Sequence, residues 1–267
     1  MNILAFIIIF LFGTIIGSFL NVVIFRLNTG KSIAKGRSIC MTCNRDLRWY
    51  ELVPIFSFLI QRGKCRRCGE SISCQYPLVE FLTGITFVLI AHHFLPTLLF
   101  SSSTYLFLVV LYAFIFSLLI IIGVYDIRHK VIPDKLVYLY IFISFLSIFL
   151  SPSLSHLIAG PIIALPFALI WYLSGGKWMG LGDAKLMLGL GFMLGLPLGV
   201  SSLILAFWIG AVVGLLIMSF SRHLPDDKVG KISMKTEIPF APFLIISAFI
   251  VFLFNLDIYT LSSLFLF

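Results

Sequence analysis

The chain has 267 residues, of which 60% are hydrophobic and only 11% charged, and its mean hydropathy is +1.11. A soluble domain of this length carries far more charge, so the composition excludes that class and indicates an all-α polytopic membrane protein. The net charge of +8 would suit a nucleic-acid-binding protein. The basic residues instead follow apolar runs, which favours the bilayer as partner and argues against nucleic acid.

The first predicted element is an apolar helix over residues 3–25. A signal-peptide core is shorter and follows a basic segment, and this run has neither property. A hydrocarbon layer of roughly 30 Å needs about 20 apolar residues in a helix, so the run is long enough to cross once. We expect a retained membrane helix at residues 1–25.

The next segment, 26–77, is the one extended polar stretch, and it contains two CxxC pairs. Their members are Cys40, Cys43, Cys65 and Cys68. Two pairs at this separation match a tetrahedral zinc site, in which four thiolates leave no open position for catalysis. Two disulfides are the alternative, which the reducing cytosol disfavours. The sequence predicts a small cytosolic zinc-ribbon-like module with a structural zinc, and it leaves Cys74 outside the site.

Seven further apolar runs follow, which gives about eight transmembrane helices in total. After the first, we place them near residues 78–96, 104–125, 136–151, 154–173, 185–199, 202–221 and 239–257. The chain then divides into a first helix (1–25), the cysteine module (26–77) and a transmembrane core (78–267).

The distribution of basic residues predicts the orientation of these helices. Every Lys and Arg lies within one of four stretches, 26–67, 128–135, 177–185 and 222–235. Eight spans put all four stretches on one side of the bilayer, and the positive-inside rule makes that side cytosolic. We expect a multi-pass protein of the cell membrane with both termini outside.

Two aspartates lie at the cytosolic ends of predicted helices. Asp126 ends the third run, where the helix dipole disfavours a carboxylate, and Asp183 follows Gly180 and Gly182 before the sixth. Ionisable groups at membrane depth are costly and therefore indicate function. Two carboxylates held close share one proton, so that one acts as base and the other as acid. This chemistry is that of an aspartyl protease.

Some of these acidic residues also have local interpretations. Asp183 is placed equally well as a helix N-cap, and Asp134, after Pro133, is interpreted as the N-cap of the fourth span. Glu51 and Glu80 are interpreted as partners of the many arginines in the polar stretch. Glycines four apart on apolar runs predict close helix packing; they are Gly13 and Gly17, Gly191, Gly195 and Gly199, and Gly210 and Gly214.

Two other classes of function are compatible with parts of the pattern. A proton- or ion-coupled transporter also uses paired membrane carboxylates, but such proteins often show internal repeats and broken helices at mid-membrane. The chain shows no internal repeat, and both aspartates lie at helix ends. A zinc-containing membrane scaffold accounts for the cysteines but not for the aspartates.

Taken in order, these segments closely resemble the bacterial type IV prepilin peptidases, also called leader peptidase/N-methyltransferases. The segments that carry the resemblance are residues 17–27, both CxxC pairs, residues 72–80, Asp126 with Ile132-Pro133, residues 180–186 and residues 238–243. A lone Gly-x-Gly-Asp would be weak evidence for this family, but the order and spacing of so many segments is specific to it.

The resemblance implies a membrane aspartyl protease in which Asp126 and Asp183 are catalytic. It implies that the basic leaders of type IV prepilins and pseudopilins are cut after a glycine on the cytosolic face. The new N-terminal amine is then methylated with S-adenosylmethionine as cosubstrate. The cysteine segment corresponds to the region linked to methyl transfer. The sequence contains no recognisable S-adenosylmethionine motif, so it assigns no residue to that molecule.

Overall fold

The computed structural model describes residues 2–30, 32–150, 154–222 and 238–260. Within them the regular structure is helical, with two isolated antiparallel bridges. The chain forms two compact units, Met1–Ile121 and Ile122–Phe267, which divide within helix α5. This architecture confirms the predicted all-α class.

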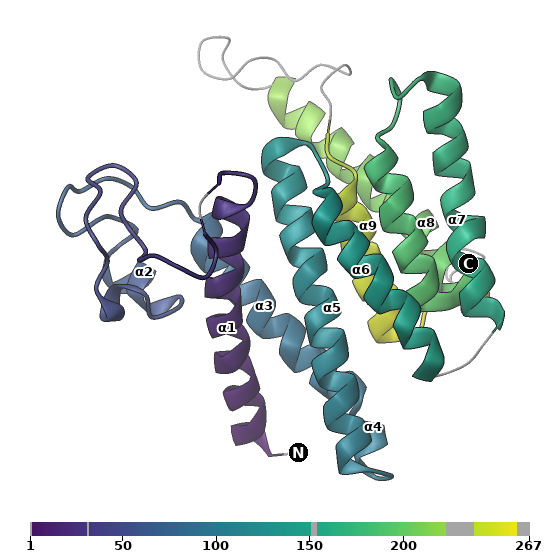
Figure 1. Ribbon diagram of the computed structural model, residues 1–267, viewed down its shortest axis with the longest axis horizontal. Helices are drawn as coiled ribbons and strands as arrows, with labels where there is room; N and C mark the ends of the chain where they lie inside the picture. The colour runs from purple at the N-terminus through teal and green to yellow at the C-terminus, as the bar shows by residue number, and fades with distance from the viewer. Residues whose placement is uncertain (1, 31, 151–153, 223–237, 261–267) are drawn as a thin grey trace. The chain divides into compact units, whose positions relative to one another are not determined.

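The first unit contains a pair of tightly packed helices and the cysteine module. Its elements are α1 (Ile3–Arg26), η1 (Trp49–Glu51), α2 (Phe56–Ile60), α3 (Gln75–His93), α4 (Leu95–Leu98) and the first part of α5 (Ser102–His129). Helix α1 packs on α3, as Figure 1 shows. A Cβ on Gly13 would lie 2.8 Å from Gly84 Cα, and one on Gly17 would lie 2.7 Å from Glu80 Cα. The predicted role of these glycines in close packing is therefore confirmed.

The second unit is a bundle around α8. Its elements are the end of α5, α6 (Asp134–Ser147), η2 (Ile148–Leu150), α7 (Leu154–Ser174), α8 (Leu181–Arg222) and α9 (Ala241–Phe254). Helix α8 contacts α6, α7 and α9, so it forms the centre of the bundle (Figure 1). At Gly191 a Cβ would meet Gly160 Cα at 2.6 Å, which explains the small residues where α7 and α8 cross.

Five helices among the described residues are long and apolar enough to cross a membrane. They are Ile3–Arg26, Gln75–His93, Ser102–His129, Leu154–Ser174 and Leu181–Ser219. Helices α6 and α9 are apolar but have only 14 residues each. These lengths indicate a multi-pass membrane protein. The predicted basic stretch 222–235 lies, apart from Arg222, outside the described residues.

The predicted sixth and seventh spans both lie in the long helix α8, which contains one non-helical residue. The sequence places the turn between these two spans around residues 195–201, and the non-helical residue of α8 is Gly195, with φ 76° and ψ 176°. This conformation belongs almost exclusively to glycine, and Pro197 follows it within the next turn. The break therefore occurs at Gly195 because glycine permits it there, at the first residue of the expected turn.

Candidate functional site

Asp126 lies in the last turn of α5 and is 6% exposed. Its carboxylate accepts a hydrogen bond from the backbone N–H of Ala241, the first residue of α9. The N-terminus of a helix carries a partial positive charge, which stabilises an anion. The dipole of α5 disfavours a carboxylate at this end of the helix. The N-terminus of α9, which faces Asp126, offsets that effect.

Asp183 is the third residue of α8 and is half-buried. It lies within the first turn, so the alternative interpretation as an N-cap does not describe its position. Asp126 is close enough for its charge to act on Asp183. The structure therefore brings together the two aspartates that the sequence singled out, both in the second unit.

The approach of the two carboxyl groups depends on Gly182. The α5–α6 connection packs on the start of α8, and a Cβ on Gly182 would lie 2.8 Å from Ile132 Cβ. A side chain at Gly182 would therefore push this connection away from α8. Gly180 has room for a side chain, because the atoms nearest to an added Cβ would be Gly182 N at 3.9 Å and Asp183 Oδ2 at 4.0 Å.

Asp134 has a partner that the sequence analysis missed. Helix α6 begins at Asp134, its N-cap is Pro133, and no side-chain cap is formed. The carboxylate instead accepts a hydrogen bond from Lys185 Nζ at 2.5 Å, and Lys185 also lies 4.7 Å from the Tyr138 ring centroid. The predicted N-cap role of Asp134 is wrong, since an ion pair to α8 takes its place.

The two CxxC pairs form two turns of the same design. Each pair is bracketed by one antiparallel bridge, Ile39 to Asp46 and Lys64 to Ser71. In each turn the first cysteine donates its N–H to the residue five positions later, Cys40 to Arg45 O (2.9 Å) and Cys65 to Glu70 O (2.8 Å). The residue after the second cysteine has positive φ, 51° at Asn44 and 71° at Gly69. Such residues tolerate this backbone conformation best.

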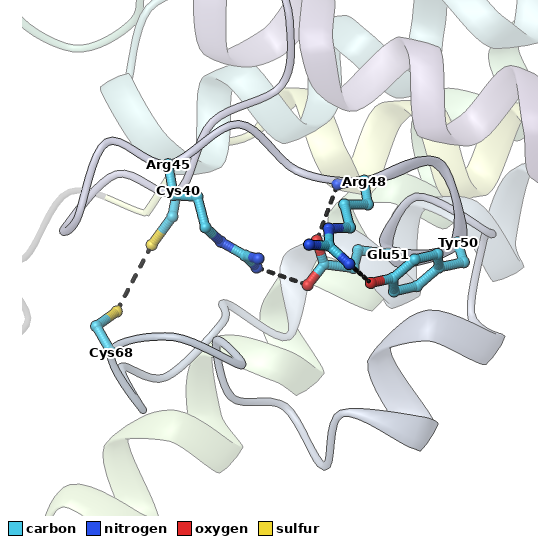
Figure 2. A network of polar contacts seen from close by, with 6 residues as sticks. All are labelled: Cys40, Arg45, Arg48, Tyr50, Glu51 and Cys68. Atoms are coloured by element: carbon cyan, nitrogen blue, oxygen red, sulfur yellow. Dashed lines mark hydrogen bonds and ion pairs between the residues drawn. The ribbon is translucent and has the colours of Figure 1, made fainter.

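The four thiols fit a tetrahedral metal ion. The Sγ atoms of Cys40, Cys43, Cys65 and Cys68 all lie within 4.8 Å of one another. Zinc–sulfur bonds of about 2.3 Å put tetrahedral ligands about 3.8 Å apart. Cys40 Sγ and Cys68 Sγ face each other across the two turns (Figure 2), and the distance between them is 3.8 Å. Cys74 is exposed and lies outside the cluster, as predicted.

The electrostatics of the cluster favour a bound dication. The backbone N–H groups of Cys68 and Arg67 lower the pKa of the Cys65 thiol to about 6. The Glu70 N–H favours the Cys68 thiolate, but burial and the neighbouring thiols outweigh it and raise the pKa of Cys68 to about 11. The thiols therefore resist becoming thiolates together unless a cation offsets their mutual repulsion.

An ion-pair network supports the first turn of the module. Arg45 donates to Glu51 Oε1 at 2.6 Å, and the Arg48 N–H donates to Glu51 Oε2 at 2.8 Å (Figure 2). Burial alone would raise the pKa of Glu51, but these two donors hold it below its usual value. The prediction that Glu51 pairs with an arginine is confirmed.

Comparison with known families covers both units. A model described as "Bacterial Peptidase A24 N-terminal domain" matches residues 11–94, and one described as "Type IV leader peptidase family" matches residues 113–215. The first range includes the four clustered cysteines, and the second includes both aspartates.

Curated relatives match over most of the chain. A "Prepilin leader peptidase/N-methyltransferase" of Bacillus subtilis (strain 168) is 34% identical, over 93% of this chain and 94% of the relative. Proteins with the same name are 32% identical in Myxococcus xanthus (strain DK1622), over 78% and 62%, and 28% identical in Stutzerimonas stutzeri, over 90% and 88%. No solved structure gives a significant match. The resemblance seen in the sequence is thereby confirmed.

Proposed function

Because the chain belongs to the type IV leader peptidase family, we propose that it removes the leaders of type IV prepilins and pseudopilins and then N-methylates the new N terminus. The relatives named prepilin leader peptidase/N-methyltransferase, which match nearly the whole chain, support both activities. The geometry of the second unit supplies the chemistry for the first of them.

The observation that carries the peptidase assignment is the convergence of Asp126 and Asp183. One carboxylate takes a proton from a water molecule, whose oxygen attacks the scissile carbonyl. The other donates a proton to the leaving amine as the carbon–nitrogen bond breaks. The α9 N-terminus beside Asp126 provides a fixed dipole that stabilises negative charge in the site. No metal is needed for these steps.

We propose an eight-crossing topology with the aspartates on the cytosolic side. Five helices are long enough individually, and the break at Gly195 divides α8 into two segments, each of which would cross once in this topology. Helices α6 and α9 complete the set. Their 14 residues span about 21 Å, so the bilayer has to thin locally around them. Grouping of all Lys and Arg residues on one side supports this orientation.

This orientation suits the substrate. A prepilin with a membrane-spanning segment and a basic leader keeps that leader in the cytosol by the same positive-inside rule. Its scissile bond then lies near the membrane boundary, at the level of helix ends such as those of Asp126 and Asp183. A glycine before the cut lets the substrate backbone extend into the site without a side-chain clash.

We propose zinc as the metal of the four-cysteine cluster, in a structural role. Cys40, Cys43, Cys65 and Cys68 would be its ligands, and four thiolates leave no position for a reacting water. Bound zinc would hold the two CxxC turns together and so fix residues 26–77. By family resemblance this module belongs to the methyl-transfer reaction, which consumes S-adenosylmethionine.

Leader removal from a purified prepilin tests the peptidase proposal against a transporter or a scaffold. The wild-type chain in detergent shortens the substrate by its leader, and Asp183→Asn does not. Asp134→Asn is the matched control, because it removes a carboxylate near the same site whose own side chain is mostly exposed. Its cleavage remains close to that of the wild type. A substrate left intact by the wild-type chain would refute the proposal.

A further inference from the structure

The first unit contains a cavity of about 680 Å³ that the peptidase reaction does not use. It lies between the end of α1, the start of α3 and the cysteine module. Cavities of this size hold small-molecule ligands. Apolar side chains such as Val22 and Phe58 line it together with many polar residues, among them Glu80 and the basic residues Arg26, Lys35 and Arg37.

Contacts made by the motifs that remained without a function hold the walls of this cavity in place. Gly17 permits the close approach of α3, and the Asn21 side chain donates to Tyr76 O at 3.1 Å, which fixes α1 against α3. The guanidinium of Arg26 donates to the carbonyls of Ser32, Lys35 and Arg37 and so ties the following loop to the end of α1. These contacts make the cavity a preformed feature of the unit.

Glu80 is the unusual group in the cavity wall. It is 6% exposed, and it accepts hydrogen bonds from the Ser18 hydroxyl and from the Ile55 N–H at 2.7 Å. Among the residues that the structure describes, no basic side chain forms an ion pair with it. The prediction that Glu80 pairs with an arginine is therefore wrong. Buried carboxylates are normally paired, so a cationic ligand is the expected complement.

The conformation of Ile55, which donates to Glu80, also indicates a ligand site. Ile55 has φ 61° and ψ −53°, and Phe56 N–H donates to Pro54 O at 2.6 Å, which is a rare and strained γ-turn. A β-branched residue disfavours positive φ strongly. Strain of this kind persists where the surroundings impose it, and it is typical of ligand sites. Here the carboxylate of Glu80 holds the strained N–H.

We propose that this cavity binds S-adenosylmethionine, with the carboxylate of Glu80 facing its sulfonium. The inference rests on the proposed N-methylation. S-adenosylmethionine carries a sulfonium and an ammonium group, and the sulfonium is the charge that S-adenosylhomocysteine lacks. The carboxylate of the same ligand suits the basic residues of the lining, Arg26, Lys35 and Arg37. A purely apolar ligand would leave the charge of Glu80 without a counter-charge. Phe25 and Tyr76, stacked at 4.9 Å in the lining, provide an aromatic wall for the adenine ring.

The alternative is that Glu80 only supports the turn at Ile55, and Glu80→Gln separates the two roles. Glutamine keeps an oxygen that accepts from the Ile55 N–H, but it removes the negative charge. Binding of S-adenosylmethionine and of S-adenosylhomocysteine, which lacks the sulfonium charge, is measured by equilibrium dialysis on the full chain in detergent. Zinc content reports that the module is folded.

In Glu80→Gln, binding of S-adenosylmethionine weakens by at least about tenfold, and that of S-adenosylhomocysteine by less than about twofold. Asp46→Asn, an exposed position of the same module outside the cavity lining, leaves both unchanged. If Glu80→Gln leaves both affinities unchanged, or weakens both equally, the assignment of Glu80 to the sulfonium is overturned, whereas the proposed N-methylation is not. A wild-type chain that binds no S-adenosylmethionine overturns N-methylation as well, whereas leader removal is measured separately.

Discussion

The two glycines before Asp183 should respond very differently to an added methyl group. In Gly182→Ala the new Cβ would lie 2.8 Å from Ile132 Cβ, 3.1 Å from its Cδ1 and 3.3 Å from its Cγ1. Non-bonded carbon atoms reach optimal contact at about 3.5–4.0 Å. The start of α8 and the α5–α6 connection therefore have to separate by about 1 Å.

This separation acts directly on the site, because Asp183 is the next residue. Overpacking of this size costs about 1–3 kcal/mol of stability. A displacement of about 1 Å in a catalytic group lowers the rate by roughly 100-fold. We therefore expect Gly182→Ala to fold and to remove leaders about 100-fold more slowly than the wild type.

Gly180→Ala is the matched control for the same motif. The nearest atoms to its new Cβ are at 3.9 Å and 4.0 Å, which is ordinary contact. Its cleavage rate should remain within about twofold of the wild type, as for most substitutions that create no clash.

The assay is the initial rate of leader removal from a purified prepilin, with thermal unfolding measured in parallel. Adding Ile132→Ala to Gly182→Ala removes two of the three close atoms and leaves Cβ, so part of the lost rate should return. Equal losses in Gly180→Ala and Gly182→Ala, or a normal rate in Gly182→Ala, would refute the packing argument.

Two further predictions concern the metal and the orientation. Elemental analysis should find about one zinc per chain. The double variant Cys40→Ser, Cys43→Ser should lose this zinc, and Cys74→Ser should retain it. Zinc lost in Cys74→Ser and kept in the double variant would contradict the ligand set. Without zinc, methyl transfer should fall more than leader removal, because the aspartates belong to the other unit. A reporter active only in the cytosol should be active when fused after Gly63 and silent after Ser101, and the reverse pattern would overturn the topology.

Local rules were sufficient to predict several parts of the molecule. Hydrophobic length predicted the long helices, and the spacing of the CxxC pairs predicted the cluster at Cys40 and Cys65. Asp126 was selected because it opposes the dipole of its own helix. These inferences need only neighbouring residues in the chain, which is why the sequence contains them.

Contacts between distant segments were not predictable in the same way. The bond from Ala241 N–H to Asp126 joins α9 to α5, and the pair of Lys185 with Asp134 joins α8 to α6. Asp134 was assigned to a local cap because the rule for caps does not consider partners elsewhere. The segment 238–243, which includes Ala241, was recognised by resemblance, but its role as a donor to Asp126 depends on how α9 packs.

The position of the break in α8 shows a second limit. A rule based on residue spacing does not distinguish Gly195 from Gly199, because both lie in the same apolar run. The structure distinguishes them, since Gly195 adopts φ 76° while Gly199 packs on Ile163, where a Cβ would lie 2.5 Å from Cδ1. The neighbours in α7 therefore determine which glycine breaks the helix and which serves packing.

The central claim is that Asp126 and Asp183 act together in one site of one chain. Its most direct test is leader removal by Asp126→Asn, by Asp183→Asn and by an equimolar mixture of the two, with Asp134→Asn as control. The account predicts no cleavage by either variant or by the mixture, and nearly normal cleavage by the control. Substantial cleavage by both single variants would contradict the catalytic pair, and cleavage restored in the mixture would contradict a single site within one chain.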